Sequence, residues 1–562
     1  MTIRKATSAE TGTVTLPPAG LPSRNPTESY WLQDLSPVLR GHRGTADLPE
    51  TADVVVVGSG ITGAFAARFL MEGLRGGEGD GEGEGGFGGV GEGEGRRVVM
   101  LEAREACSGA TGRNGGHCQP LVYGSVPAVA AFELEVFEFL ERVVREEGVE
   151  CDWVSLTGVH AFLSKDMFEL AAAEAQQLQQ SHPELAAQLE VVRPSDSSSS
   201  SPTGQKHTLA SLHVPSAQGA VIQQKAASLW PYKLVASILE RLIAKFPAPA
   251  FNLQTNTPVT SLARADSGPG WTLTTPRGKI TARQVLLATN GYTSHLLPAF
   301  SDLIVPVRGQ IGALVLPPNN PSRLPAVKLT HSYVFAADPD PDSDLRVPRD
   351  DYLVQRPLPT GEMIYGGGRR FARGLGVGEW RDDEVEVEVA RYLRRNLSPP
   401  LDLAPALTPD DYSVEGQQQG MGMVEEQGDE EELEASFEWT GVMGYSRDHH
   451  AWVGAVPESL GGGGPQGGLW ICAGYTGHGM PAAALSAREV VRQMVGGEVV
   501  AAEAAEAGEE EGGRVRFPRE FVLDEERVGR ARGLPHLTQG WEATNFATLI
   551  GGSGMPVGRK GM

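Results

Sequence analysis

Two uninterrupted apolar runs enclose a helical pattern near the start of the chain. Residues 53–58 (DVVVVG) and 97–103 (RVVMLEA) predict buried strands, because their apolar positions are consecutive and mostly β-branched. Between them, ITGAFAARFLMEGL repeats apolar residues at helical spacing. This order predicts a βαβ unit. Residues 468–495 repeat the pattern as strand, glycine turn and helix, so a nucleotide-binding domain is expected to draw on both ends of the chain.

The middle of the chain shows other periodicities. Residues 126–148 and 225–246 predict amphipathic helices, the second with Pro231 near its start, where a missing N–H costs least. From about residue 251 to 370, many stretches alternate apolar and polar positions. Such alternation is typical of an antiparallel sheet with one solvated face.

Three tracts are too rich in Gly, Ser, Gln or Glu to bury much apolar surface, namely residues 76–95, 194–204 and 416–436. We expect them to be flexible surface insertions. Residues 76–95, 416–436 and 503–511 also hold six, seven and five acidic residues and no basic one, against a formal net charge of −23. The rest of the chain is therefore only mildly acidic, and charge identifies no partner. We expect no nucleic-acid partner.

The sequence gives no sign of export or membrane insertion. Four cysteines without a CxxC pair favour a reducing compartment. No signal-peptide core is seen, and no apolar run approaches the roughly 18 residues that a membrane helix needs. We therefore expect a cytoplasmic protein with no membrane partner.

Gly58, Gly60 and Gly63 form a GxGxxG turn between the first strand and its helix. Gly58 allows the tight turn, Gly60 lets a pyrophosphate approach the backbone, and Gly63 lets the helix pack closely on the strand. Glu102 ends the next strand, where a carboxylate can accept ribose hydroxyls. It stands 39 residues after Gly63, but deleting the 20-residue tract 76–95 reduces this to 19. That spacing predicts dinucleotide binding, because about 20 residues are expected.

A second glycine-rich turn, EACSGATGRNGGHCQP (105–120), follows the Glu102 strand within a few residues. A nicotinamide dehydrogenase normally has a crossover helix there. FAD is longer, and its isoalloxazine lies far from its adenine, so it needs close backbone approach at a second place. The second turn therefore favours FAD over NAD as the cofactor.

These motifs resemble a known family. VVVVGSGITG, VVMLEAREACSGATGRNGGH, KAASLWPYKLV, VLLATNGYTSHLLP, VPVRGQI and LWICAGYTGHGM are similar, in the same order, to the D-amino-acid-oxidase-like FAD-dependent oxidoreductases. That group contains sarcosine oxidase, glycine oxidase and γ-glutamylputrescine oxidoreductase, and the TGRNGGH form is most like the last branch. The resemblance covers roughly residues 50–500.

The resemblance implies a set of FAD contacts along the motifs. It places the diphosphate at the first turn, the ribose near the acidic strand end, the adenine near NTPVTSL, and the flavin near GYTGHGM. The implied cofactor-binding residues are Gly58, Gly60, Ile61, Thr62, Gly63, Glu102, Ala103, Arg104, Ser108, Thr111, Gly112, Arg113, Asn114, Gly115, Val259, Ala288, Thr289, Gly477, His478, Gly479 and Met480. Met480 is expected at the start of the final helix.

No catalytic acid or base is predicted. Arg308, Gln310, Arg369 and His478 are candidates for contacts with the substrate or the flavin. Arginine suits a carboxylate because its planar fork donates two parallel hydrogen bonds, but a purely structural role for Arg308 is equally open. Asp448, His449 and His450 are adjacent in sequence and so rarely converge on one ion; we expect no metal.

The predicted fold is an α/β FAD-binding Rossmann-like domain with an inserted α+β substrate domain built on a mostly antiparallel sheet. The expected segments are an arm (1–50), FAD-binding parts (51–150, 246–300 and 437–500), substrate-domain parts (151–245 and 301–415), the acidic insertion (416–436) and a C-terminal tail (501–562).

The predicted function is oxidation of the C–N bond of a small amine or amino acid. Hydride transfer to flavin N5 gives an imine that water hydrolyses, and molecular oxygen or another acceptor takes the electrons. Three alternatives stay open: an FAD-dependent dehydrogenase of a hydroxy acid or an N-methyl amine, a nicotinamide dehydrogenase, and a non-catalytic flavin-binding regulatory protein.

Overall fold

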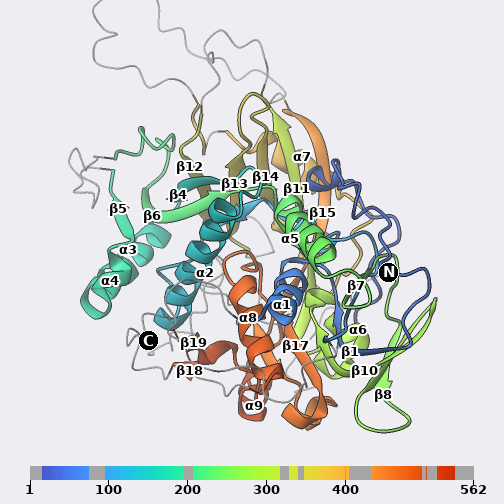
Figure 1. The fold of residues 1–562 in the computed structure, drawn as a ribbon. Helices are drawn as coiled ribbons and strands as arrows, with labels where there is room; N and C mark the ends of the chain where they lie inside the picture. The colour runs from blue at the N-terminus through green and yellow to red at the C-terminus, as the bar shows by residue number, and fades with distance from the viewer. Residues whose placement is uncertain are drawn as a thin grey trace, which may run out of the picture.

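Two large β-sheets contain most of the strands, one in the upper and one in the lower part of the view, with helices packed around them (Figure 1). The computed structural model describes residues 16–74, 95–194, 207–316, 328–339, 347–398, 400–403, 432–496, 501–502 and 516–537. Most of the expected flexible tracts 76–95, 194–204 and 416–436 lies outside these residues.

The first sheet contains the predicted βαβ unit. Strand β1 (Thr51–Val57) lies between β2 (Val98–Leu101) and β10 (Gly278–Leu287), and it is parallel to both. Strands β17 (Leu469–Ala473) and β7 (Phe251–Gln254) extend the parallel part. The antiparallel members are β16 (Trp452–Ala455), β8 (Ser261–Arg264) and β9 (Trp271–Thr275). The carboxyl ends of the parallel strands meet at one edge, which is where open α/β sheets bind ligands.

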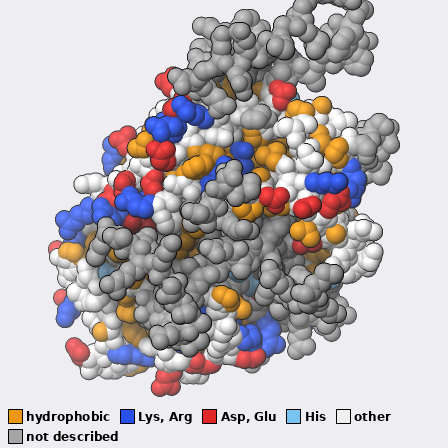
Figure 2. All heavy atoms as spheres, turned by 180° about the vertical axis from the view of Figure 1, so that it is seen from behind, with side chains coloured by type: hydrophobic (Ala, Val, Ile, Leu, Met, Phe, Trp, Pro, Cys, Tyr) orange, Lys and Arg blue, Asp and Glu red, His pale blue; other side chains and the backbone are white. Residues whose placement is uncertain are grey.

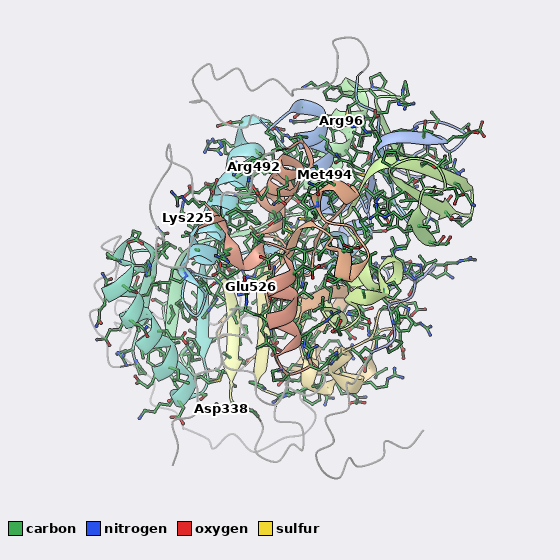
Figure 3. The ribbon with its side chains drawn as sticks, turned by 90° about the horizontal axis from the view of Figure 1, so that it is seen from below. Arg96, Lys225, Asp338, Arg492, Met494 and Glu526 are labelled. Atoms are coloured by element: carbon green, nitrogen blue, oxygen red, sulfur yellow. The ribbon has the colours of Figure 1, made fainter. Side chains whose placement is uncertain are left out.

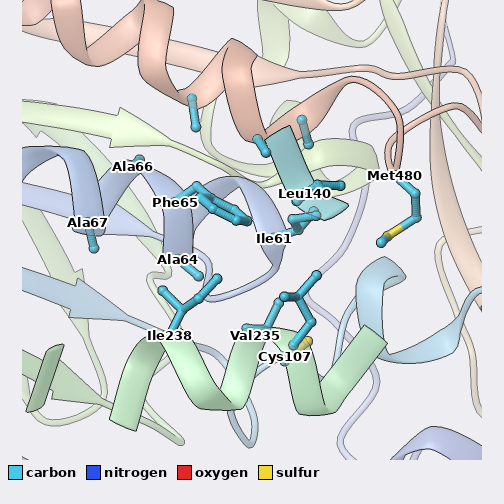
Figure 4. Packing of buried hydrophobic residues seen from close by; sticks show 14 of the residues in the cluster. Ile61, Ala64, Phe65, Ala66, Ala67, Cys107, Leu140, Val235, Ile238 and Met480 are labelled. Carbon is cyan, nitrogen blue, oxygen red and sulfur yellow. The ribbon is translucent and has the colours of Figure 1, made fainter. Parts of the chain in front are cut away.

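Helices α1 (Ile61–Glu72), α5 (Pro231–Lys245) and α8 (Ala483–Met494) form the helical layer on this sheet, and α2 (Pro127–Glu146) packs on α8. Figure 4 shows Val235 and Ile238 of α5 pointing toward α1. The Phe65 ring of α1 packs on the Phe139 ring of α2, with 5.6 Å between the ring centroids. Four of the nine buried residues of α1 are alanine or glycine, which leaves room for the neighbouring helices to approach.

The second sheet runs in the order β15 (Glu434–Ser446), β11 (Ile304–Val315), β14 (Met363–Gly367), β13 (Arg349–Gln355), β12 (His331–Ala337), β4 (Val154–Phe162), β6 (Gly219–Ser228) and β3 (His117–Cys118). Strand β5 (Leu189–Val192) pairs with β6. Neighbouring strands are antiparallel except for β12 and β4, which are parallel. Helices α3 (Lys165–Ser181), α4 (Pro183–Ala186) and α7 (Val387–Arg395) accompany this sheet.

The structure departs from the expected elements at three places. Residues 225–228 belong to β6 and not to a helix, because they pair with β4; the helix begins at Pro231. That helix, α5, packs on α1 of the first sheet, although it lies in the segment 151–245 expected for the other domain. Strand β15 begins at Glu434, so the last residues of the tract 416–436 are in a strand paired with β11.

Part of the expected tail is ordered on the body. Strand β19 (Phe517–Pro518) packs on α2. Helix α9 (Glu525–Arg532) packs on the first sheet, and just before it the Leu523 N–H donates to the Val453 carbonyl at 3.0 Å. In Figure 3, Glu526 marks α9, and Arg492 and Met494 mark the end of α8. Helix α9 is therefore the last helix described, and α8, which follows Met480, is not the final one.

On the face seen in Figure 2, basic and acidic side chains are interspersed, with apolar side chains between them. Within the residues searched, no helix combines the length and apolar character needed to span a bilayer.

Candidate active site

A cavity of about 370 Å³ lies between the two sheets. One wall comes from the carboxyl ends of β1, β2, β10 and β17, where Val57, Leu101, Ala288 and Tyr475 line it. The opposite wall comes from the second sheet, chiefly from β11, β13 and β15. The cavity is therefore placed at the strand ends that favour ligand binding, with a second wall facing them.

The first glycine turn joins β1 to α1 beside this cavity. Gly58 has a φ of +105°, and a Cβ there would lie 2.6 Å from the Ala288 carbonyl oxygen. A Cβ on Gly63 would lie 1.9 Å from the Gly58 carbonyl oxygen, so this glycine allows the helix to meet the strand. Gly60, Ile61 and the next residue of α1 line the cavity, and the first-turn amides of a helix have no intrahelical acceptor. This wall suits a phosphate.

Glu102 is fixed at the end of β2. One carboxylate oxygen accepts hydrogen bonds from the Ser59 amide (3.0 Å) and hydroxyl (2.6 Å), and the other accepts from the Arg104 amide (3.0 Å). The side chain is buried and lines the cavity. Two carboxylate oxygens offer about four lone-pair positions, so Glu102 retains capacity to accept from a hydroxyl.

The second glycine turn reaches the same cavity. Thr111, Arg113, Asn114 and Gly115 all line it. Thr111 also ties the two turns together, because its hydroxyl accepts from the Ile61 amide at 3.1 Å. Both turns therefore border one continuous space, which is the arrangement that an elongated dinucleotide requires.

Most of the proposed cofactor contacts line this cavity. They are Gly58, Gly60, Ile61, Thr62, Glu102, Ala103, Arg104, Thr111, Arg113, Asn114, Gly115, Val259, Ala288, Thr289, Gly477, His478, Gly479 and Met480. Gly63, Ser108 and Gly112 do not line it. Gly112 has a packing role, since a Cβ there would lie 2.1 Å from the Cys107 carbonyl oxygen.

The N-terminal arm packs against the second turn. Trp31 is fully buried, and its indole N–H donates to the Asn114 carbonyl at 2.5 Å. The Ser29 hydroxyl donates to the Gly112 carbonyl at 2.8 Å. Residues 20–22 of the arm line the cavity as well. The arm therefore forms part of the site.

Two arginines near the second turn bind protein groups. Arg104 donates to both carboxylate oxygens of Asp382, at 3.0 and 2.9 Å. Arg113 donates to the Thr440 carbonyl at 2.6 Å and to Thr27 of the arm. Burial lowers the pKa of Arg113 to about 10, although Asp382 opposes this shift. Sequence reasoning missed Asp382, because nothing local marks it as the partner of these distant arginines.

The candidate substrate residues differ in their surroundings. Arg308 forms an ion pair with Glu386, and Gln310 exchanges hydrogen bonds with the backbone of Glu386 at 2.8 and 3.1 Å. Both side chains hold β11 to the start of α7, which is the structural alternative considered for Arg308. Arg369 donates to the Tyr445 hydroxyl at 2.8 Å and lies 3.5 Å from an Asp350 carboxylate oxygen.

One end of the cavity is lined by His117, Gln119 and His160. His160 lies 2.6 Å from the Tyr123 hydroxyl and 2.5 Å from the Gln119 amide nitrogen, while His117 lies 2.9 Å from the Ser332 hydroxyl. Burial, reinforced by neighbouring imidazoles, lowers the pKa of His117 to about 4 and that of His160 to about 3. Both rings are therefore neutral at neutral pH.

Asp448, His449 and His450 do not converge on a shared point. Asp448 instead pairs with Arg527 of α9 at 2.8 Å. Among the residues searched, no cluster of three or more His, Cys, Asp or Glu side chains is arranged to hold a metal.

Comparison with known proteins decides the family. The family model described as "FAD dependent oxidoreductase" (DAO) matches residues 53–493. The chain belongs to the DAO family of FAD-dependent oxidoreductases. This DAO-family chain is thus an enzyme with FAD as its cofactor, which excludes the nicotinamide and non-catalytic alternatives.

Solved structures share the fold at low sequence identity. Glycine oxidase from Geobacillus kaustophilus superposes with a TM-score of 0.53 at 17% identity, over 80% of this chain and 96% of that one. L-amino acid deaminase from Proteus vulgaris superposes with a TM-score of 0.52 at 13% identity, over 82% of this chain and 94% of that one. L-proline dehydrogenase from P. horikoshii superposes with a TM-score of 0.50 at 16% identity, over 79% of this chain and 93% of that one. No curated protein matches the sequence.

The residues present fit FAD. The glycines at both turns let the residues that border the cavity pack closely: a Cβ on Gly60 would touch the Thr111 hydroxyl at 3.0 Å, and one on Gly115 would overlap the Tyr352 ring at 2.2 Å. The amino-terminal end of α1, a fixed carboxylate and a second turn supply the donor and acceptor types that diphosphate, ribose and flavin need.

Proposed function

We propose that this DAO-family enzyme oxidises the C–N bond of a small amine or amino acid, giving an imine that water hydrolyses. The observation that carries the proposal is the shared cavity, which joins the two glycine turns to polar and aromatic side chains of the second sheet. FAD, when bound, supplies the acceptor for the two electrons and the hydrogen of the C–H bond. The protein's own task is to bind, orient and protect the substrate.

We assign the cofactor contacts by position along the cavity. Gly58, Gly60 and the start of α1 hold the diphosphate, and Glu102 holds the ribose. The turn at Asn114 and the segment Gly477–Met480 border the flavin. The resemblance to the family and the continuity of the cavity support this assignment.

Arg369 and Asp350 form the substrate end in this proposal. Their side chains are 16% and 11% exposed and line the cavity, Asp350 from β13 and Arg369 from the turn after β14, and Tyr352 and Tyr445 line the wall as well. Burial raises the pKa of Asp350, although Arg369 opposes that shift. The pair presents both signs of charge in a water-poor place, which matches a substrate that carries an ammonium and a carboxylate.

Anaerobic flavin reduction tests the proposal. Glycine, both alanine enantiomers, proline, butylamine, sarcosine and lactate are mixed with the purified enzyme, and loss of the visible flavin absorbance is followed. Reduction by an amine or amino acid is expected. Reduction by lactate alone would contradict C–N oxidation and favour the hydroxy-acid alternative. Reoxidation of the reduced enzyme by air then separates an oxidase from a dehydrogenase.

A matched pair of variants tests the substrate end. Arg369→Ala removes a guanidinium that lines the cavity, whereas Arg370→Ala removes one that packs on the Phe371 and Tyr392 rings. Arg369→Ala is expected to raise the KM for the best amino acid by on the order of 100-fold, since a charge-assisted hydrogen bond contributes about 1.5–3 kcal/mol. Arg370→Ala should leave it within about twofold. Equal effects in both variants would remove Arg369 from substrate binding.

A further inference from the structure

His478 lies in a wall shared by two spaces. It lines the main cavity, and it also lines a smaller chamber of about 10 Å³. That chamber is close to the ~10–15 Å³ that one water molecule needs. Its polar lining comes from Glu133, His449, His450, Tyr475 and His478, so a water there has several partners.

Glu133 of α2 is buried behind His478. One of its carboxylate oxygens accepts a hydrogen bond from the Leu121 amide at 2.7 Å, and the other lies 3.4 Å from His478 Nδ1. The two side chains are 5% and 22% exposed. A carboxylate at this distance favours the protonated imidazole and the tautomer with hydrogen on Nδ1, which leaves the Nε2 lone pair on the opposite edge of the ring.

The other histidines near His478 lack this support. His117 of β3 and His160 of β4 line the same cavity, and burial lowers their pKa values to about 4 and 3. On the chamber side, burial lowers the pKa of His450 to about 3 and also lowers that of His449. Among the described histidines that line the main cavity, His478 is the one with a carboxylate within 4.0 Å.

We propose that His478, supported by Glu133, accepts the proton that an ammonium substrate must lose before its C–H bond is oxidised. This inference rests on the proposed function. An N–H bond of the ammonium group breaks, and its proton bonds to His478 Nε2, leaving a neutral amine and an imidazolium beside the Glu133 carboxylate. The nitrogen lone pair released in this step then assists hydride departure from the neighbouring carbon. The chamber gives the proton a route away from the cavity through a single water.

The Tyr475 hydroxyl does not compete for this role. Burial raises its pKa well above the ordinary value, and it is hydrogen-bonded to Thr62 at 2.9 Å and to Cys472 at 3.1 Å.

The pH dependence of flavin reduction tests the proposal in His478→Gln, Glu133→Gln and a control. Glu135→Gln is the control, because Glu135 is on the same helix but pairs with Arg488. At pH 7, His478→Gln is expected to lower the reduction rate by on the order of 100-fold, and Glu133→Gln by about tenfold. The ratio of the wild-type rate to the rate of each of these two variants should fall about tenfold per pH unit, because the amine, with a solution pKa of roughly 10, increasingly loses its own proton in solution. Glu135→Gln should follow the wild type.

A second readout needs no turnover. In NMR titrations of the holoenzyme, one histidine ring signal should vanish in His478→Gln, and its titration midpoint should move to lower pH in Glu133→Gln. FAD content, measured by absorbance, should be unchanged in Glu135→Gln, and the reduction rates of all variants are compared per bound FAD.

Failure of the proposed function and failure of the proton-acceptor role give different results. Wild-type reduction by no amine or amino acid at any pH overturns the proposed function. If amines do reduce the wild type, two results overturn the proton-acceptor role of His478. One is a reduction rate in His478→Gln that equals the wild-type rate or is lowered by the same factor at every pH. The other is an unchanged titration midpoint of the histidine signal in Glu133→Gln.

Discussion

Trp31 is expected to couple the N-terminal arm to FAD binding. Its ring is fully buried and makes edge-to-face contacts with Tyr30 and Trp230, at centroid distances of 5.1 and 5.9 Å. Its indole N–H holds the Asn114 carbonyl in the second glycine turn. Loss of this side chain therefore loosens a turn that borders the cofactor cavity.

Two substitutions separate the hydrogen bond from the packing. Trp31→Phe keeps most of the ring but leaves the Asn114 carbonyl without its indole donor, which costs about 1–3 kcal/mol. Trp31→Ala also opens a cavity and is expected to lower the free energy of unfolding by about 3–5 kcal/mol. The lost hydrogen bond destabilises the turn conformation that binds FAD. FAD affinity is therefore expected to fall by roughly tenfold for each 1.4 kcal/mol of this destabilisation.

The assay is FAD titration of deflavinated protein, followed by urea unfolding of the same samples. Trp153→Phe is the matched control, because Trp153 also donates its indole N–H, to Ser155 at 3.0 Å, but does not line the cavity. Both Trp31 variants should bind FAD more weakly than Trp153→Phe does. Wild-type FAD affinity in Trp31→Ala, with only the global stability reduced, would refute the coupling.

Two further outcomes follow from the packing and the ion pairs. Gly63→Ala places a Cβ 1.9 Å from the Gly58 carbonyl oxygen, so it should lower the free energy of unfolding by about 3 kcal/mol and remove most of the bound FAD. Gly529→Ala is the control, because a Cβ there meets nothing within 4 Å, and it should change neither quantity. Normal FAD content in Gly63→Ala would be inconsistent with this packing. Burial alone would raise the pKa of Asp448, but Arg527 lowers it from 3.8 to about 2, so this pair stabilises the fold above pH 3.8 and its contribution of about 2 kcal/mol is lost as pH falls toward 2. Asp448→Asn should lack that acid-dependent loss in urea titrations, and an unchanged acid profile would argue against the pair.

Local patterns predicted the elements that local sequence controls. The β1–α1–β2 unit follows from consecutive apolar residues and GxGxxG, and Glu102 was located once the intervening acidic tract was discounted. The second turn was identified because its glycines stand close to that strand. These features need no knowledge of distant contacts.

Contacts between residues far apart in the chain could not be predicted from the sequence. Residues 225–228 fit a helical pattern, yet pairing with β4 makes them a strand. Arg308 read equally well as a ligand contact or as a structural residue, and only the position of Glu386 shows its ion pair. The Trp31 contact with Asn114 and the Glu133 contact with His478 join segments far apart in the chain, and no local periodicity encodes them.

A crystal structure of the purified protein with its bound cofactor tests the central claim most directly. We predict electron density for one extended FAD that passes Gly60 with its diphosphate and reaches Asn114 with its flavin. Density for the cofactor elsewhere, or for a dinucleotide that leaves the Asn114 turn untouched, would contradict the account.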